Sequence, residues 1–210
     1  MEIALTAVFI FLLSLIFALW EIEIEGKNGW AGKLPTWYKK SGASSMFYNL
    51  TKKPLSGYHL MMLLFTLASF HVIFFLNTPW NLFNEINILI VWLIFLIIED
   101  FLWFQFNPYY GSKKFKRKNV WWYGNEKWIF EIFPISYLRG IYFLICAIVI
   151  SAMVFNSNSF LKNYLELIGI EIVFSLISQI LVRPYKFWYK KMQTLDESKT
   201  FNRKIIFEKI

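Results

Sequence analysis

Two adjacent acidic residues, Glu99 and Asp100, interrupt a stretch that is predominantly apolar or aromatic, "INILIVWLIFLIIEDFLWFQF" (86–106). A stretch of about 20 such residues can cross a bilayer as a helix. Ionisable side chains within a span usually face the bundle interior or a water-filled cavity, where they mark functional sites. Two neighbouring carboxyl groups can divide the roles of acid and base, because like charges disfavour joint ionisation. The pair is therefore the first candidate for proton-transfer chemistry.

Other polar side chains are expected at the same depth as this pair. If the first apolar helix continues through "EIEIE" (21–25), two of its glutamates lie one turn apart on one face, and Gly26 is a natural stop. The alternative is a helix end with its charges in water. We expect the catalytic residues to be His59, Glu99 and Asp100. We expect the substrate to contact Glu21, Glu25, Trp103, Asn107 and Arg139.

His59, Glu99 and Asp100 also form a mixed imidazole and carboxylate set, which suits Zn, Mn or Fe. The chain has only two histidines, and neither an HExxH motif nor a histidine box occurs in the sequence. The single cysteine, Cys146, excludes a disulfide framework and a cysteine-rich metal site. The sequence therefore leaves a divalent metal ion at these three residues as an open alternative.

A second pair of polar residues is expected toward the opposite end of the molecule. His71 and Glu171 lie in the second and fifth apolar stretches at comparable depth. They could form a proton relay or a structural ion pair. A hydrogen bond from His71 to a backbone carbonyl or to a serine such as Ser69 or Ser175 explains this histidine equally well.

The elements that must position these residues are membrane-spanning helices. The chain has 210 residues, of which 57% are hydrophobic and 17% charged, against about 25% charged in soluble domains. The sequence predicts an all-α integral membrane protein with a spanning domain at 1–182 and a basic tail at 183–210. The five predicted spans are 3–20, 60–77, 86–106, 137–155 and 164–182.

The orientation of these spans follows from the lysines and arginines. They are concentrated in segments 21–59 and 107–136 and in the tail, whereas segments 78–85 and 156–163 together contain only Lys162. With five spans, every basic segment falls on one side. The positive-inside rule then predicts an outer N-terminus and a cytoplasmic C-terminus in a multi-pass protein of the cell (inner) membrane.

The net charge of +8 is explained by this distribution. Basic clusters beside a span, such as "SKKFKRK" (112–118), typically meet anionic lipid headgroups. We therefore expect membrane lipids and a second copy of the chain as partners, and no nucleic acid. The segment 119–134, rich in tryptophan and ending at Pro134, predicts an interfacial helix.

Three blocks resemble a group of uncharacterised, small, multi-pass prokaryotic membrane proteins that carry similar blocks in the same order. The blocks are "EIEIEGKNGWAGKLPTW" (21–37), "GYH" (57–59) and "EDFLWFQFNPYYG" (99–111). The resemblance covers the first two thirds of the chain and implies that the glutamates, the histidine and the acid pair belong to one site. Members of that group often have a histidine after a tryptophan pair, where this chain has Tyr123. No activity is carried over.

Three functions fit this pattern. The first is a membrane-embedded enzyme that acts on a lipid or lipid-linked substrate at the cytoplasmic interface, with Arg139 or the basic loops binding phosphate. The second is a transporter or channel for a cation or proton, which needs a continuous polar path. The third is a membrane subunit or assembly factor whose acids pair with a partner helix. The position of the acids relative to a cavity distinguishes the three.

Overall fold

The computed structural model describes residues 3–111 and 114–196. Its α-helices are α1 (Ile3–Glu25), α2 (Ser45–Thr51), α3 (Gly57–His71), α4 (Leu82–Phe106), α5 (Ile135–Val154), α6 (Asn158–Ile177) and α7 (Gln179–Thr194). Two antiparallel pairs of short strands lie between them: β1 (Tyr38–Lys39) with β2 (Leu55–Ser56), and β3 (Trp128–Ile129) with β4 (Phe133–Pro134). Short 3-10 helices complete the described elements: Gly42–Ser44, Val72–Phe75, Arg117–Asn119 and Trp121–Tyr123.

Four helical stretches are long and apolar enough to cross a membrane: α1, α3 with its 3-10 extension, α4 and α5. The bent pair α6 and α7 makes a fifth if it counts as one span. Many large apolar side chains on these helices point outward, among them Phe9 and Phe65, each 58% exposed, and Ile150, 59% exposed. A surface of this kind fits a lipid solvent, so the helical membrane architecture agrees with the prediction.

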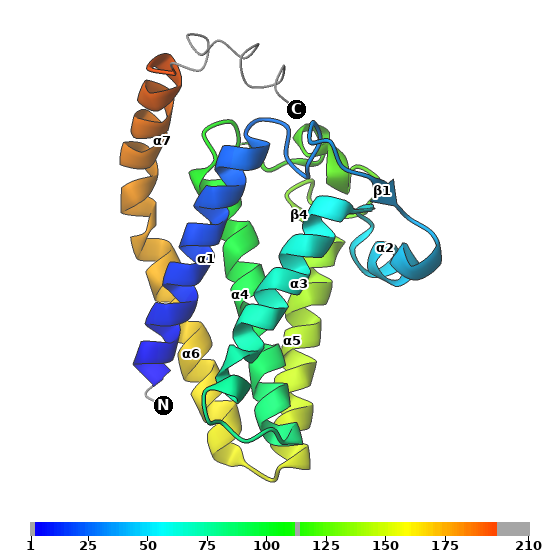
Figure 1. The fold of residues 1–210 in the computed structure, drawn as a ribbon, viewed down its shortest axis with the longest axis vertical. Coiled ribbons are helices and arrows are strands. Elements are labelled where there is room, and N and C mark those ends of the chain that lie inside the picture. The colour runs from blue at the N-terminus through cyan, green and yellow to red at the C-terminus, as the bar shows by residue number, and fades with distance from the viewer. Residues whose placement is uncertain (1–2, 112–113, 197–210) are drawn as a thin grey trace, which may run out of the picture.

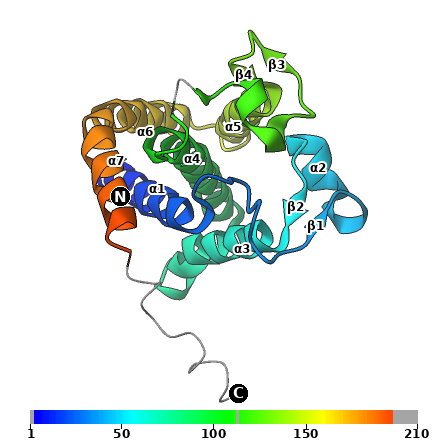
Figure 2. The same cartoon turned by 90° about the horizontal axis from the view of Figure 1, so that it is seen from above.

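Two helices form the centre of the bundle. α1 packs along α4 through buried residues such as Ile10, Phe17 and Phe95. Ser14 donates a hydrogen bond of 3.3 Å to the Phe95 carbonyl and so ties the two helices together. Viewed from above, α6 and α7 lie on one side of this pair, while α3 and α5 lie at two separate places around α4 (Figure 2). α2 stands beyond them, at the rim.

The connections fall into two groups at opposite ends of the bundle (Figure 1). The long segments 26–56 and 107–134 lie at one end, together with the end of α7. The short connections 76–81 and 155–157 lie at the other end, together with the start of α1. The basic segments therefore gather at one end, as predicted. We refer to it below as the loop end.

The predicted fifth span, 164–182, is wrong in its bounds. Its helix ends at Ile177, and α7 continues from Gln179 at an angle of 47°. The side chains of Ser178 and Gln179 both donate to the Ser175 carbonyl, at 2.8 and 3.1 Å. Such local hydrogen bonds compete with the helical ladder and bend helices. The position where the tail was predicted to begin, residue 183, lies inside α7.

The predicted interfacial helix at 119–134 is also wrong. The segment contains parts of two 3-10 helices and the β3–β4 hairpin. Phe130 and Glu131 have φ values of +50° and +59°, and the Ile132 amide donates to the Ile129 carbonyl at 3.0 Å. Two successive residues in the left-handed region close a hairpin and cannot continue a right-handed helix.

α1 continues through the "EIEIE" stretch to Glu25, as one of the two sequence interpretations required. Gly26 follows with a φ of +53°, and its amide donates to the Ile22 carbonyl at 2.9 Å. This is a left-handed helix stop. It places Glu21 and Glu25 on one face of α1, both buried.

Candidate functional site

A cavity of about 580 Å³ opens near the loop end, between α1, α3, α4 and α5. This volume lies within the range of about 300 to 1,000 Å³ that is usual for ligand pockets. Seven of the eight predicted site residues line it: Glu21, Glu25, His59, Glu99, Asp100, Trp103 and Arg139. The structure therefore brings together residues that are up to 118 positions apart in the chain.

The cavity has one polar end and one apolar end. Its polar end carries the acidic residues, His59 and Lys53, near the loops. Its apolar end is formed by α3, α4 and α5. Leu93 is seven residues before Asp100 on α4, about 10 Å deeper along the helix. Other apolar lining residues are Met62, Leu63, Leu96, Ile97, Phe143 and Ala147.

The cavity reaches the side surface of the bundle beside α2 and α5. Leu50 on α2 and Phe143 on α5 both line it and are 40% and 53% exposed. Since neighbouring outward side chains are apolar, this opening faces the region expected to hold lipid.

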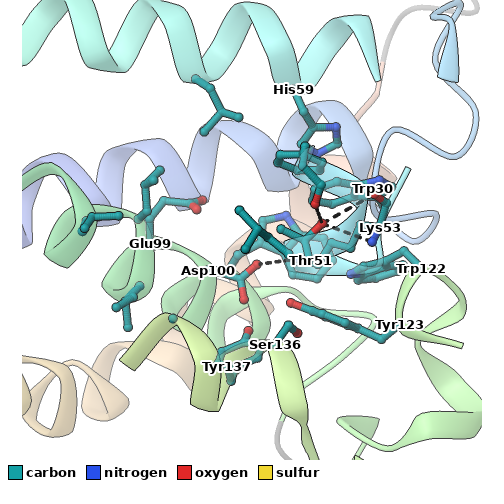
Figure 3. A pocket seen from close by; sticks show the side chains of 18 of the residues that line it. Trp30, Thr51, Lys53, His59, Glu99, Asp100, Trp122, Tyr123, Ser136 and Tyr137 are labelled. Carbon is teal, nitrogen blue, oxygen red and sulfur yellow. Dashed lines mark hydrogen bonds and ion pairs between the residues drawn. The ribbon is translucent and has the colours of Figure 1, made fainter. Parts of the chain in front are cut away.

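Asp100 points across the cavity toward Lys53 and the opposite wall (Figure 3). Its carboxylate lies 3.8 Å from the Lys53 ammonium nitrogen, and its side chain is 32% exposed. Glu99, one residue earlier, is only 6% exposed and points to another side, toward α1. The Oε1 atom of Glu99 is buried and has no hydrogen-bond partner. The adjacent acids thus have separate surroundings.

Lys53 is a buried cation that the sequence did not single out. Its ammonium lies 4.3 Å from the centre of the Trp30 ring and 4.1 Å from that of the Tyr123 ring. The residue is 7% exposed. Burial lowers the pKa of Lys53, and the nearby Asp100 carboxylate opposes that shift. A lysine with a lowered pKa gives up its proton more readily, so Lys53 can act as an acid or as a binding group.

His59 is fixed from three sides. Its Nδ1 lies 2.6 Å from the Ser56 hydroxyl oxygen, and Trp30 stacks on its ring at 3.7 Å between centroids. Its Nε2 faces a Glu25 carboxylate oxygen at 3.4 Å. Ser56 also caps α3 by accepting from the His59 amide at 3.1 Å. The element that begins the helix therefore also orients the histidine.

Glu25 is held by the loop that follows α1. The amides of Trp30 and Ala31 donate to its carboxylate at 2.9 and 2.5 Å. Both donors have positive φ values, +47° and +54°. Non-glycine residues in this region cost about 1–3 kcal/mol each and cluster at functional sites. The "GWAG" stretch therefore positions a carboxylate at the cost of local strain.

Arg139 lies at the edge of the cavity and binds the 107–134 segment. Its guanidinium lies 3.6 Å from the Glu126 carboxylate and donates to the Leu50 carbonyl at 3.2 Å. Ser136 donates to the other Glu126 oxygen at 2.6 Å. Burial raises the pKa of Glu126, while Ser136 and Arg139 counter that shift. Arg139 thus joins α5 to the loops as well as lining the cavity.

Two predicted assignments are corrected by the structure. Asn107 does not line the cavity: it is fully buried and donates to the Gly26 carbonyl at 2.9 Å, so it fastens the end of α4 to the end of α1. His71 does not pair with Glu171. A short connection places it beside the start of α4, where its Nε2 lies 3.0 Å from Glu85, while Nδ1 contacts the Leu67 carbonyl at 2.7 Å. The backbone hydrogen bond was the alternative interpretation.

Among the described residues, one group of side chains has metal-ligand geometry: Glu21, Glu25 and His59, whose ligand atoms lie within 4.8 Å of one another. The set expected from the sequence was His59 with Glu99 and Asp100. Asp100 instead faces Lys53.

Comparisons with protein-family models, curated proteins and solved structures find no match. The roles of the site residues therefore rest on their geometry. Sequence reasoning missed three cavity residues in the segments between the long helices: Lys53, Trp30 and Tyr123. One signal was the need for a positive charge near the acids of the site, since a buried carboxylate requires a nearby cation or proton.

Proposed function

We propose that this protein is a membrane-embedded enzyme that acts on a lipid or lipid-linked substrate. The observation that carries the proposal is the division of one cavity into an acidic end near the loops and an apolar end between α3, α4 and α5. A molecule with a polar group and a hydrocarbon chain matches both ends. The opening at Leu50 and Phe143 gives such a molecule an entrance from the side.

Asp100 and Lys53 supply the chemistry in this proposal. Asp100 is the general base, because it is the most exposed of the acids that line the cavity and it lies beside the Lys53 ammonium group. It takes a proton from a hydroxyl group of the substrate or from water. Lys53, 3.8 Å away, stabilises the negative charge that develops on oxygen or donates a proton to the leaving group.

Two observations favour an enzyme over the other functions. A cation path needs polar groups along its length, whereas the lining farthest from Asp100 is apolar, as at Leu93 and Ala147. Acids that bind a partner helix would face outward. Instead, Glu21, Glu25 and Glu99 are 6%, 5% and 6% exposed.

Reducing the volume of the cavity tests whether it holds a lipid. Gly140 on α5 lines the cavity, and an added Cβ would meet no atom within 4 Å. Gly140→Leu therefore places a side chain in the cavity without displacing backbone. Overlap with a bound chain costs about 1–3 kcal/mol, so lipid retained through purification should fall about five-fold or more. Native mass spectrometry in detergent measures the retained lipid.

Gly169→Leu is the matched control. Gly169 also lies in a helix with open space at its Cβ, but it is not part of the cavity lining. This variant should retain lipid as the unmodified protein does. Equal lipid retention by both variants and the unmodified protein would contradict the proposal.

The role of Asp100 is tested once the retained lipid is known. Asp100→Asn keeps the shape of the side chain and removes the base. Turnover of that lipid should fall by at least about 100-fold, while binding persists. Glu85→Gln, a change at the opposite end of α4, serves as the control and should leave turnover intact. Normal turnover in Asp100→Asn would remove Asp100 from the mechanism.

A further inference from the structure

Three ligand-type side chains from two helices meet at the polar end of the cavity. Glu21 and Glu25 come from α1 and His59 from α3, and one ligand atom of each lies within 4.8 Å of the other two. The three residues are 6%, 5% and 4% exposed. We propose that they bind one divalent first-row metal ion, such as Zn²⁺ or Mn²⁺. The ion-binding proposal stands without the lipid proposal; only its use in a reaction rests on the proposed function.

The first argument is an unbalanced charge. Glu21 Oε1 is buried and has no hydrogen-bond partner, and the same holds for Glu99 Oε1. A buried carboxylate without a counter-charge costs several kcal/mol. The two protein cations that line the cavity lie against other acids, Lys53 against Asp100 and Arg139 against Glu126. A divalent cation between Glu21 and Glu25 supplies the missing charge.

The second argument is that the ligands are already oriented. The Trp30 and Ala31 amides hold Glu25, and each of its oxygens keeps a second lone pair for a metal ion. The Ser56 hydroxyl oxygen contacts Nδ1 of His59 at 2.6 Å. If Nδ1 carries the proton and donates it there, the Nε2 lone pair is free to bind a metal. Outer-shell hydrogen bonds of this kind are typical of metal-binding histidines.

The third argument is the spacing between His59 and Glu25. Their Nε2 and Oε1 atoms are 3.4 Å apart, longer than the roughly 2.7–3.2 Å of a good N–H···O hydrogen bond. Two ligands at about 2.0–2.2 Å from a tetrahedral zinc ion are about 3.4 Å from each other. The pair is therefore spaced as two ligands of one ion rather than as a tight ion pair.

Such an ion has a defined place in the cavity. Three protein ligands leave an open position, as in catalytic zinc sites. All three ligands line the cavity, so the open position faces the space that holds the polar part of a substrate. There the metal ion polarises a carbonyl or phosphoryl oxygen, or lowers the pKa of a bound water.

Metal content tests the site directly. The full chain, purified in detergent with a tag that contains no histidine, is stripped with a chelator, reloaded with Zn²⁺ or Mn²⁺ and desalted. Inductively coupled plasma mass spectrometry should then find about one ion per chain. Glu21→Gln and His59→Ala should each weaken binding by more than the roughly 10- to 100-fold that loss of an outer-shell partner costs.

Glu171→Gln is the matched control for Glu21→Gln. It removes another buried carboxyl group, 1% exposed and with both oxygens unpartnered, that lies outside the cluster. This variant should bind metal as the unmodified protein does. Size-exclusion chromatography of all variants separates loss of a ligand from loss of the fold.

A second readout needs no variant, because the chain contains only two histidines. Bound metal should protect His59 from diethylpyrocarbonate, whereas His71, at the other end of the bundle, reacts equally with and without metal. Binding of neither ion, or equal binding in Glu21→Gln, His59→Ala and Glu171→Gln, overturns the metal site. That result leaves lipid retention by Gly140→Leu as a separate test of the proposed function.

Discussion

Lys53 brings a positive charge into a cavity dominated by acids, and its surroundings make that charge tolerable. Desolvating an ammonium group is costly. The rings of Trp30 and Tyr123, with their centres 4.3 and 4.1 Å from the nitrogen, offset part of this cost, since a desolvated cation–π contact is worth about 2 kcal/mol. The Asp100 carboxylate, 3.8 Å from the ammonium nitrogen, adds a direct ionic attraction. These contacts stabilise the Lys53 ammonium group inside the cavity and leave it close enough to a substrate to donate a proton.

The titration of Lys53 can be measured by amine acetylation with a small apolar reagent. Burial favours the neutral amine and so lowers the pKa below the ordinary value of 10.5. The reactive neutral form should then appear at a lower pH than in an unperturbed lysine. Peptide mass spectrometry after labelling across a pH series gives the midpoint for Lys53.

The same measurement on Asp100→Asn checks the cause. The Asp100 carboxylate raises the pKa of Lys53 and opposes the effect of burial. Removal of this carboxylate should therefore lower the pKa of Lys53 and shift the midpoint of labelling to a still lower pH. A midpoint at or above 10.5 in the unmodified protein would refute the account of Lys53.

Residues of the site differ in how readily the sequence reveals them. Glu99, Asp100 and His59 stand out because each interrupts or begins an apolar stretch, and all three line the cavity. Lys53 stands among five other lysines in segment 21–59, and nothing local distinguishes a buried lysine from an exposed one. Its burial arises from Trp30 and Tyr123, which are 23 and 70 residues away in the chain.

At the scale of elements, the loop after α1 holds the Glu25 carboxylate in place through its backbone amides. Gly29 has a φ of +57°, and a Cβ there would overlap the Trp122 ring. The loop therefore packs its backbone directly on the 107–134 segment. The Trp121 indole adds a hydrogen bond of 2.9 Å to the Asn28 carbonyl. The position of the Glu25 carboxylate depends on this contact between two loops.

Gly29→Ala should destabilise the protein more than Gly42→Ala. Both glycines have positive φ values, +57° and +66°, but a Cβ at Gly42 meets no atom within 4 Å. The backbone cost of about 1–2 kcal/mol is common to both changes. The overlap with Trp122 should add about 1–3 kcal/mol at Gly29. Thermal unfolding in detergent compares the two, and equal unfolding temperatures would rule out close packing at Gly29.

Helices were easier to predict than the segments between them. The length and apolar character of a span identify it without knowledge of its neighbours, and α1, α3, α4 and α5 follow the prediction. The β3–β4 hairpin was missed because its turn uses Phe130 and Glu131 at positive φ, where glycine or asparagine is the usual signal. The bend at Ser178 was missed because serine and glutamine are compatible with a straight helix.

At the scale of the whole molecule, the bundle is polarised. The segments 26–56 and 107–134 and the end of α7 lie at one end, and the connections 76–81 and 155–157 lie at the other (Figure 1). The cavity lies near the first of these ends. Orientation therefore decides which side of a membrane has access to the acidic residues.

Cysteine labelling tests the predicted orientation. In a Cys146→Ala background, Ser41→Cys and Thr78→Cys place one thiol in each group of connections. An impermeant maleimide should label Thr78→Cys in intact cells and label Ser41→Cys only after permeabilisation, since basic segments remain inside. Labelling of both thiols from the same side would contradict the predicted crossing of α3, the one span that lies between residues 41 and 78.

The opening beside α2 and α5, bordered by Leu50 and Phe143, has a kinetic consequence. A substrate that enters sideways is taken from the two-dimensional solution of one leaflet and not from the surrounding buffer. Its effective concentration is then its mole fraction among the surrounding lipids or detergent molecules. Saturation curves should collapse onto one another when plotted against that surface fraction, whatever the bulk volume.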